Sequence, residues 1–293
     1  MRASGSIRYG IGRTQWIACD LRRRPGIGYL YPSRAVSVCL ARVQSMTPKR
    51  GGDGFSGVLA SVGKKPRAIN QNVTRHYSET LSKALALWLR NRLLKDPRVH
   101  KILSPEATVP TCFGKKSLDI GCLDASGYLS LDISIKTFSF RDRRTDRYTH
   151  NFTGRFYELL GEGLDLRLSY PEAVLCALVF LPLDSCDDGT AGAASSFGNA
   201  VKQYAKIAGR GTDGEHALSF EHVFIGLYDE SDGVSFFNAV TPPPRHGPPA
   251  PKTLITTQQM LEIILTTVAD RAAQRQKHKM NIQPAFRWAD TTS

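Results

Sequence analysis

The residues best suited to chemistry lie in two neighbouring segments of this 293-residue chain. Asp119 stands within Ser-Leu-Asp-Ile-Gly, and Ser134 and Lys136 follow fifteen and seventeen residues later. A lysine on a largely apolar strand is costly to bury unless it is paired. Beside a carboxylate it could hold a water molecule or stabilise charge next to a metal-bound phosphate. The pattern therefore favours phosphate chemistry if the fold brings the three side chains together.

A β-hairpin is expected to bring them together. Residues 116–122 and 128–138 favour strands, and Asp-Ala-Ser-Gly at 124–127 between them is typical of a turn. The second strand alternates strictly, so each of its faces should carry one kind of side chain. The apolar face should carry Leu129, Leu131, Ile133 and Ile135, and the polar face Ser130, Asp132, Ser134 and Lys136. Asp119 would lie beside the polar face.

The flanking segments predict alternating helices and strands. The helical period at 76–95, with Ser78 at the helix start, places Glu79 in the first turn. Further helices are expected at about 153–169, from Ser195, and at about 254–277, with strands at 173–181, 222–228 and 234–240. The strand at 173–181 is apolar throughout, as a strand covered on both faces would be. This order predicts an α/β fold with a central mixed sheet flanked by helices.

In these motifs and this order of elements, residues 76–240 resemble the PD-(D/E)xK nuclease superfamily, which includes most Type II restriction endonucleases. The resemblance implies a restriction-endonuclease-like core in which Asp119 and Lys136 match the catalytic motif, with Leu118 in place of its proline. Ser134 stands where the family usually has Glu or Asp. Some restriction enzymes of the superfamily carry Ser-x-Lys here and supply the acid from the following helix.

Three acids could replace the missing ligand. Glu158 is preferred because it is nearer the helix start and stands in Arg-x-x-Glu. Glu162 is the alternative, since residues four apart share a helix face. Asp132, on the same strand face as Lys136, is a weaker alternative.

The resemblance also implies a cofactor and roles. Asp119 and Glu158, with a backbone carbonyl near Ile135, would hold one or two Mg²⁺ ions. Lys136 would orient the attacking water, and Glu79 would bind a second metal or orient its water, as an early-helix glutamate does in several relatives.

The expected partner is double-stranded DNA, cut at a short symmetric site by a homodimer. Between Lys136 and Arg155 there are six basic and two acidic residues. The arginines of this segment could contact phosphates and guanine edges. They are Arg141, Arg143, Arg144, Arg147 and Arg155.

The positive charge is distributed unevenly along the chain. The formal net charge is +13, but residues 1–45 contribute +7 of it, with eight arginines and one acid, Asp20. This basic leader has three interpretations: an organellar transit peptide, a phosphate-binding arm, or an over-extended translation start, with the protein beginning at Met46. After it we expect a basic polar tether at 46–75, the nuclease core at 76–240, a Pro-rich spacer at 241–252, and a C-terminal helix and tail at 253–293. The last helix is a candidate dimer or packing element.

Cysteine spacing and hydropathy limit the cellular compartment and the class of protein. The six cysteines include no C-x-x-C pair, which favours free thiols in a reducing, cytoplasmic compartment. No apolar run is long enough for a membrane span. Alternatives to the restriction-like enzyme are a repair or recombination nuclease of the same fold, and a nucleic-acid-binding module that has lost catalysis, which Ser134 favours. An organellar protein of unrelated activity is a third.

Overall fold

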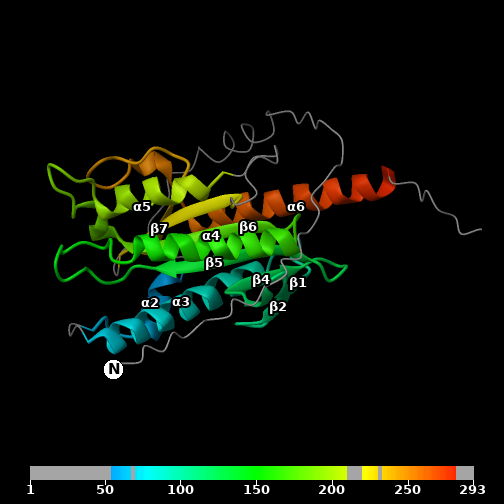
Figure 1. Ribbon diagram of the computed structural model, residues 1–293, viewed down its shortest axis with the longest axis horizontal. Helices are drawn as coiled ribbons and strands as arrows, with labels where there is room; N and C mark the ends of the chain where they lie inside the picture. Colours follow the sequence, from blue (N-terminus) through cyan, green and yellow to red (C-terminus); the bar gives the residue numbers. More distant parts are fainter. Residues whose placement is uncertain (1–53, 67–69, 210–219, 230–232, 282–293) are drawn as a thin grey trace, which may run out of the picture. The chain divides into compact units, whose positions relative to one another are not determined.

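The computed structural model describes residues 54–66, 70–209, 220–229 and 233–281, with side chains up to 276 (Figure 1). All of them belong to one compact unit, Ser33–Ser293. The predicted leader, residues 1–45, lies outside the described residues. The four cysteines in the described ranges have free thiols, as their spacing predicts. No helix among the described residues is long and apolar enough to cross a membrane.

Within the described ranges, seven strands form one mixed sheet in the order β1-β4-β5-β6-β7-β8-β9. Strands β5, β6 and β7 are parallel neighbours, and the other neighbours are antiparallel. The strands are β1 (Lys101–Ile102), β4 (Ile120–Leu123), β5 (Leu129–Thr137), β6 (Val174–Pro182), β7 (His222–Asp229), β8 (Gly233–Asn238) and β9 (Leu254–Ile255). A separate pair joins β2 (Thr108–Thr111) to β3 (Gly114–Ser117). The predicted α/β class with a central mixed sheet is confirmed.

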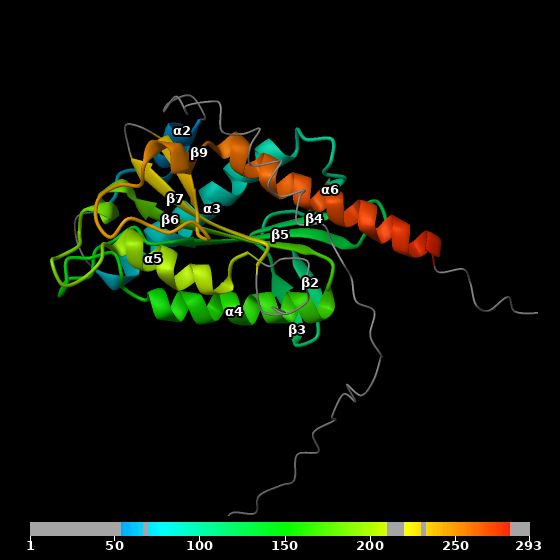
Figure 2. The ribbon, with the colours of Figure 1, turned by 90° about the horizontal axis from the view of Figure 1, so that it is seen from above.

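Helices cover both faces of this sheet (Figure 2). One face packs against α4 (Phe152–Ser169) and α5 (Ser196–Tyr204). The other packs against α2 (Phe55–Val62), α3 (Gln71–Leu93) and α6 (Thr257–Asn281). Short 3₁₀ turns follow β6 and α5 and precede β9: η1 (Leu183–Cys186), η2 (Ala205–Ile207) and η3 (Pro251–Thr253). Strand β6 is central because its apolar side chains are buried on both faces, which confirms the prediction from its composition.

The hairpin between β4 and β5 has the predicted turn. The Asp124 carboxylate accepts hydrogen bonds from the backbone N–H groups of Ser126 and Tyr128, and Gly127 takes a positive φ of 81°. A register shift at Cys122 and Leu123 changes one predicted face, because an irregular pairing interrupts the alternation of side chains. Leu129 packs on the α4 side, whereas Leu131, Ile133 and Ile135 pack on the α3 side.

The interval predicted as a tether, 46–75, contains folded structure. Helix α2 buries Phe55 and Val58, and the Phe55 ring packs edge-on against Trp88 at 5.4 Å. Helix α3 begins at Gln71, five residues before the predicted start, because the Asn70 side chain accepts the Asn72 N–H and caps the helix. Glu79 therefore lies beyond the first turn, contrary to the prediction.

The C-terminal helix completes the core, so the sheet and its cover extend past the predicted boundary at 240. After the Pro-rich spacer, β9 pairs with β8 through Phe236 and Ile255. Helix α6 then buries Met260, Leu261 and Ile264 in the same cluster as α3. Of the two roles predicted for this helix, packing is the one that the structure shows.

Candidate functional site

The hairpin sets Asp119 against β5, as predicted. Ile120 pairs with Ile133, so Asp119 comes opposite Ser134 in the strand register. One carboxylate oxygen of Asp119 accepts the backbone N–H of Ile135 at 2.7 Å. The side chains of Ser134 and Lys136 both reach Glu162 on α4. The strand pair and α4 thus bring these polar side chains into one cluster.

Glu162, the alternative acid, occupies the centre of that cluster. The Lys136 amine donates to both carboxylate oxygens of Glu162, at 3.1 and 3.3 Å. The Ser134 hydroxyl lies 3.2 Å from Glu162 Oε2, and the Lys116 amine lies 2.8 Å from Oε1. The side chains of Lys136 and Glu162 are only 11% and 18% exposed, so these contacts are largely screened from water.

Glu158, the preferred acid, lies at the edge of the cluster. Its carboxylate is 4.0 Å from the Lys136 amine, its side chain is 44% exposed, and it pairs with Arg155 at 2.6 Å. Glu158 and Glu162 share a helix face, but they are separated by about one turn, or ~5.4 Å along the axis. That displacement carries Glu158 away from Ser134 and toward the arginine.

Asp132 is buried beneath these groups. Its side chain is 1% exposed, Oδ2 lies 3.3 Å from the Ser134 hydroxyl, and Oδ1 has no hydrogen-bond partner among the described residues. Burial raises the pKa of Asp132 to about 8, with further contributions from the charges of Glu162 and Asp119. The raised pKa favours the protonated form of Asp132 near pH 7, and a protonated acid is a poor metal ligand.

Burial also raises the pKa of Asp119, and the charge of Glu162 adds to the rise. The hydrogen bond from the Ile135 N–H and the charge of Lys136 lower the pKa of Asp119, but they do not cancel the rise. Burial acts in the same direction on Glu162, but Lys136 and Lys116 outweigh it and hold the pKa of Glu162 below its ordinary value. The charge of Glu162 thus acts on Asp119, which shows that the two carboxylates belong to one electrostatic environment.

Glu79 forms an ion pair within its own helix. Its side chain is 53% exposed and pairs with Arg75 at 2.7 Å on the same helix. The carbonyl of the preceding residue, Ser78, accepts a hydrogen bond from Thr137 at the end of β5, at 3.4 Å. The backbone of α3 is therefore near the strand end, whereas the described contact of Glu79 is an ion pair along its own helix.

Three of the five arginines predicted to bind DNA make contacts within the protein. Arg141 donates to Asp184 at 2.9 Å, Arg147 donates to the carbonyl of Ala194, and Arg155 pairs with Glu158. Arg143 and Arg144 have exposed side chains. Of the five predicted DNA contacts, these two are the most accessible.

Lys116 is the member of the cluster that sequence reasoning missed. It lies on β3 and contacts Glu162, yet its only sequence signal is a basic residue three positions before Asp119. The pairing depends on α4 lying over β3, which no local pattern reveals.

The cluster contains few groups that could bind a metal ion. No group of three or more His, Cys, Asp or Glu side chains in the described parts of the chain is arranged to hold a metal. Mg²⁺, however, usually binds one or two carboxylates together with water and phosphate oxygens. Asp119 and Glu162 are the two carboxylates of the cluster that could serve as such ligands, although Glu162 also pairs with two lysines.

Comparison with family models, curated proteins and solved structures finds no match to this chain.

Proposed function

We propose that the chain is a Mg²⁺-dependent endonuclease that hydrolyses phosphodiester bonds of double-stranded DNA, with a restriction-endonuclease-like core. One observation carries the proposal: Glu162 of α4 lies 3.2 Å from the Ser134 hydroxyl and 3.1 Å from the Lys136 amine. A helix acid thus reaches the strand position where the superfamily's usual acid is absent. Asp119, Glu162 and Lys136 supply the two acids and the lysine that the resemblance implies.

Each residue then has a role. Asp119 and Glu162 would hold Mg²⁺, with the carbonyl of Ile135 as a further oxygen. When bound, the ion supplies charge stabilisation at the scissile phosphate. Lys136 orients the attacking water, and its contact with Glu162 positions the amine before substrate binds. Lys116 offsets part of the negative charge on Glu162.

DNA contact and symmetry belong to the same proposal. Arg143 and Arg144 would bind phosphates beside the cluster. A homodimer would place two such clusters on the two strands of a short symmetric site, as in Type II restriction enzymes. A repair or recombination nuclease would use the same cluster without that symmetry.

The decisive experiment compares two glutamates on one helix face. Glu162→Gln should abolish Mg²⁺-dependent cleavage of plasmid DNA, because it removes a charged ligand while preserving side-chain size. Glu158→Gln, its matched control, should retain cleavage within about a factor of ten, since Glu158 is half exposed and paired with Arg155. Lys136→Ala should lower the rate roughly 100-fold or more. EDTA should stop the wild-type reaction.

The opposite pattern, with activity lost in Glu158→Gln and kept in Glu162→Gln, would assign the acid to Glu158. Full activity in both Glu162→Gln and Asp119→Ala would rule out this metal site.

A nucleic-acid-binding module without catalysis is the second candidate. It is favoured by the contact of Glu162 with two lysines, which balances the charge of the cluster without a cation. Binding to labelled duplex DNA in EDTA, together with an absence of cleavage in Mg²⁺ or Mn²⁺, would identify this function.

A further inference from the structure

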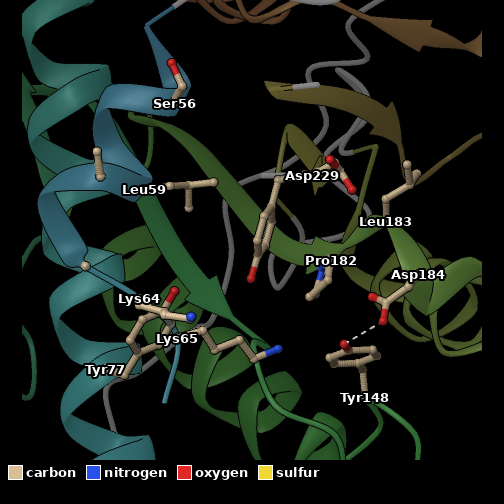
Figure 3. Close-up of a pocket in the computed structure, with 13 residues that line it drawn as sticks. Ser56, Leu59, Lys64, Lys65, Tyr77, Tyr148, Pro182, Leu183, Asp184 and Asp229 are labelled. Atoms are coloured by element: carbon tan, nitrogen blue, oxygen red, sulfur yellow. Dashed lines mark hydrogen bonds between the residues drawn. The ribbon is translucent and has the colours of Figure 1, made fainter. Parts of the chain in front are cut away.

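A pocket of about 650 Å³ lies at the carboxyl ends of β6 and β7 (Figure 3). Helix α2, the segment after it and Tyr77 of α3 line one side, and Tyr148, η1 and the ends of β6 and β7 line the other. None of the pocket's lining residues belongs to the Asp119–Glu162 cluster. The volume is typical of small-molecule sites, and ligands in α/β folds bind at the carboxyl ends of parallel strands.

Three tyrosines in the pocket wall are held by contacts within the protein. The Tyr228 hydroxyl lies 3.2 Å from Ser139 Oγ, and the Tyr148 hydroxyl donates to Asp184 at 3.0 Å. The Tyr77 ring packs edge-on against Phe140, with centroids 5.5 Å apart. Tyr148 and Tyr228 are only 3% and 7% exposed, and Arg141 also lies over the Tyr148 ring at 4.9 Å, so the partly exposed Tyr77 is the most accessible ring. A ring held in place in this way loses little entropy when a flat aromatic ligand stacks on it.

Two lysines bring positive charge to the same wall. Lys64 and Lys65 follow Gly63, whose positive φ of 82° turns the chain after α2. The Lys65 amine lies 5.3 Å from the Phe140 ring centroid and 5.5 Å from that of Tyr148. Figure 3 shows this amine reaching across the pocket toward Tyr148.

Acidic acceptors stand on the opposite wall. Asp184 follows the end of β6, and Asp229 ends β7. Both line the pocket, and the close-up shows them across it from the lysines (Figure 3). The pocket thus combines one accessible aromatic ring, cations on one side and hydrogen-bond acceptors on the other.

We propose that this pocket binds a nucleotide. The base stacks on the partly exposed Tyr77 ring, the phosphate pairs with Lys64 and Lys65, and Asp229 accepts hydrogen bonds from amino or hydroxyl groups. The nucleotide is either a free nucleoside monophosphate or one unit of a DNA strand, since both present the same chemistry. Binding here does not depend on the proposed nuclease activity.

The test is calorimetric titration of the full chain in EDTA, which removes Mg²⁺ from the carboxylate cluster. The probes are the four deoxynucleoside monophosphates, a short single-stranded oligodeoxynucleotide, the nucleosides and inorganic phosphate. A nucleotide should bind saturably and more tightly than either its nucleoside or phosphate. Lys65→Ala should weaken binding about tenfold, the loss of one charge-assisted contact. Lys202→Ala, at an exposed lysine of α5, should leave it unchanged.

Thermal unfolding of each variant would verify its fold, and Lys64→Ala replaces Lys65→Ala if the latter is unfolded, because Lys64 is exposed. Tighter binding of the monophosphate identifies a free nucleotide as the ligand, and tighter binding of the oligonucleotide identifies a DNA strand. Absence of saturable binding, equal affinity for phosphate, or no effect of either lysine substitution would overturn the proposal.

Discussion

Ser134 has one hydroxyl hydrogen, yet its oxygen lies within 3.3 Å of two carboxyl groups, those of Asp132 and Glu162. The pKa of Asp132, raised to about 8 chiefly by burial, resolves this conflict. A protonated Asp132 can donate to the Ser134 oxygen, which leaves the hydroxyl hydrogen for the charged Glu162.

Asp132→Asn tests this protonation through the pH dependence of stability. The folded-state pKa of Asp132, about 8, exceeds its ordinary value of 3.8, so the native state retains a proton that the unfolded chain releases. The stabilisation from Asp132 is thus complete below pH ~4 and is lost as the pH rises toward ~8, by at most about 1.4 kcal/mol per pH unit. In Asp132→Asn this loss of stability with rising pH should be absent, because asparagine does not titrate.

Urea unfolding in EDTA at several pH values from 5 to 8 would measure the effect. The stability of the wild type should decrease relative to that of Asp132→Asn as the pH rises. Parallel pH profiles for the two proteins would show that Asp132 is already ionised in the folded state.

At the scale of elements, the arginines of the loop between β5 and α4 differ in exposure. Arg141 and Arg147 tie the loop to Asp184 and Ala194, so their guanidinium groups are committed to contacts within the protein. Arg143 and Arg144 are exposed. If the loop contacts DNA, the salt dependence of binding should depend mainly on these two exposed residues.

Replacing both Arg143 and Arg144 with Ala should reduce the slope of log K against log salt by about 1.8, because each phosphate contact contributes roughly 0.9. Fluorescence anisotropy with labelled duplex DNA, titrated in EDTA at several salt concentrations, would measure the slope. The double substitution of the exposed Lys202 and Lys206 serves as control and should leave it unchanged. The same slope in all three proteins would exclude the loop from the DNA interface.

At the scale of the molecule, a buried ionic network links helices from opposite faces of the sheet. Glu221, 3% exposed, pairs with Arg167 of α4 and with Arg271 of α6, both at 2.9 Å. It also accepts the backbone N–H of Leu175 in β6 at 2.7 Å. Because α4 carries Glu162, this network fastens the helix that supplies the proposed metal ligand.

Glu221→Gln should lower the free energy of unfolding by about 3 kcal/mol, because two partly or fully buried arginines lose their counter-charge. Glu262→Gln, at a 46% exposed carboxylate paired with Arg98, should cost less than about 1 kcal/mol. Chemical denaturation at one pH compares the two variants. Similar small losses in both would show that the buried network contributes little to stability.

Local patterns predicted most of the fold and part of the site. The hairpin followed from a recognisable turn and alternation, and it placed Asp119 beside Ser134 as expected. Helix α2 was not predicted because the surrounding sequence is polar and rich in glycine. Its buried residue Phe55 packs against Trp88, a contact between distant residues that the local sequence does not reveal. The sequence preferred Glu158 to Glu162 because Glu158 is nearer the helix start, but a shared helix face does not reveal which of the two lies level with Lys136.

The sequence by itself determined the residue types, the order of the main elements from the β4–β5 hairpin to β8, and the strand face on which Lys136 lies, because these depend on periodicity and nearest neighbours. Only the tertiary structure decided that Glu162 contacts Lys136, that Lys116 joins it, and that Asp132 is buried beneath them. The physical reason is that charge pairing and burial depend on how the fold brings α4, β3 and β5 together. Those contacts join residues far apart in the chain, and no local pattern records them.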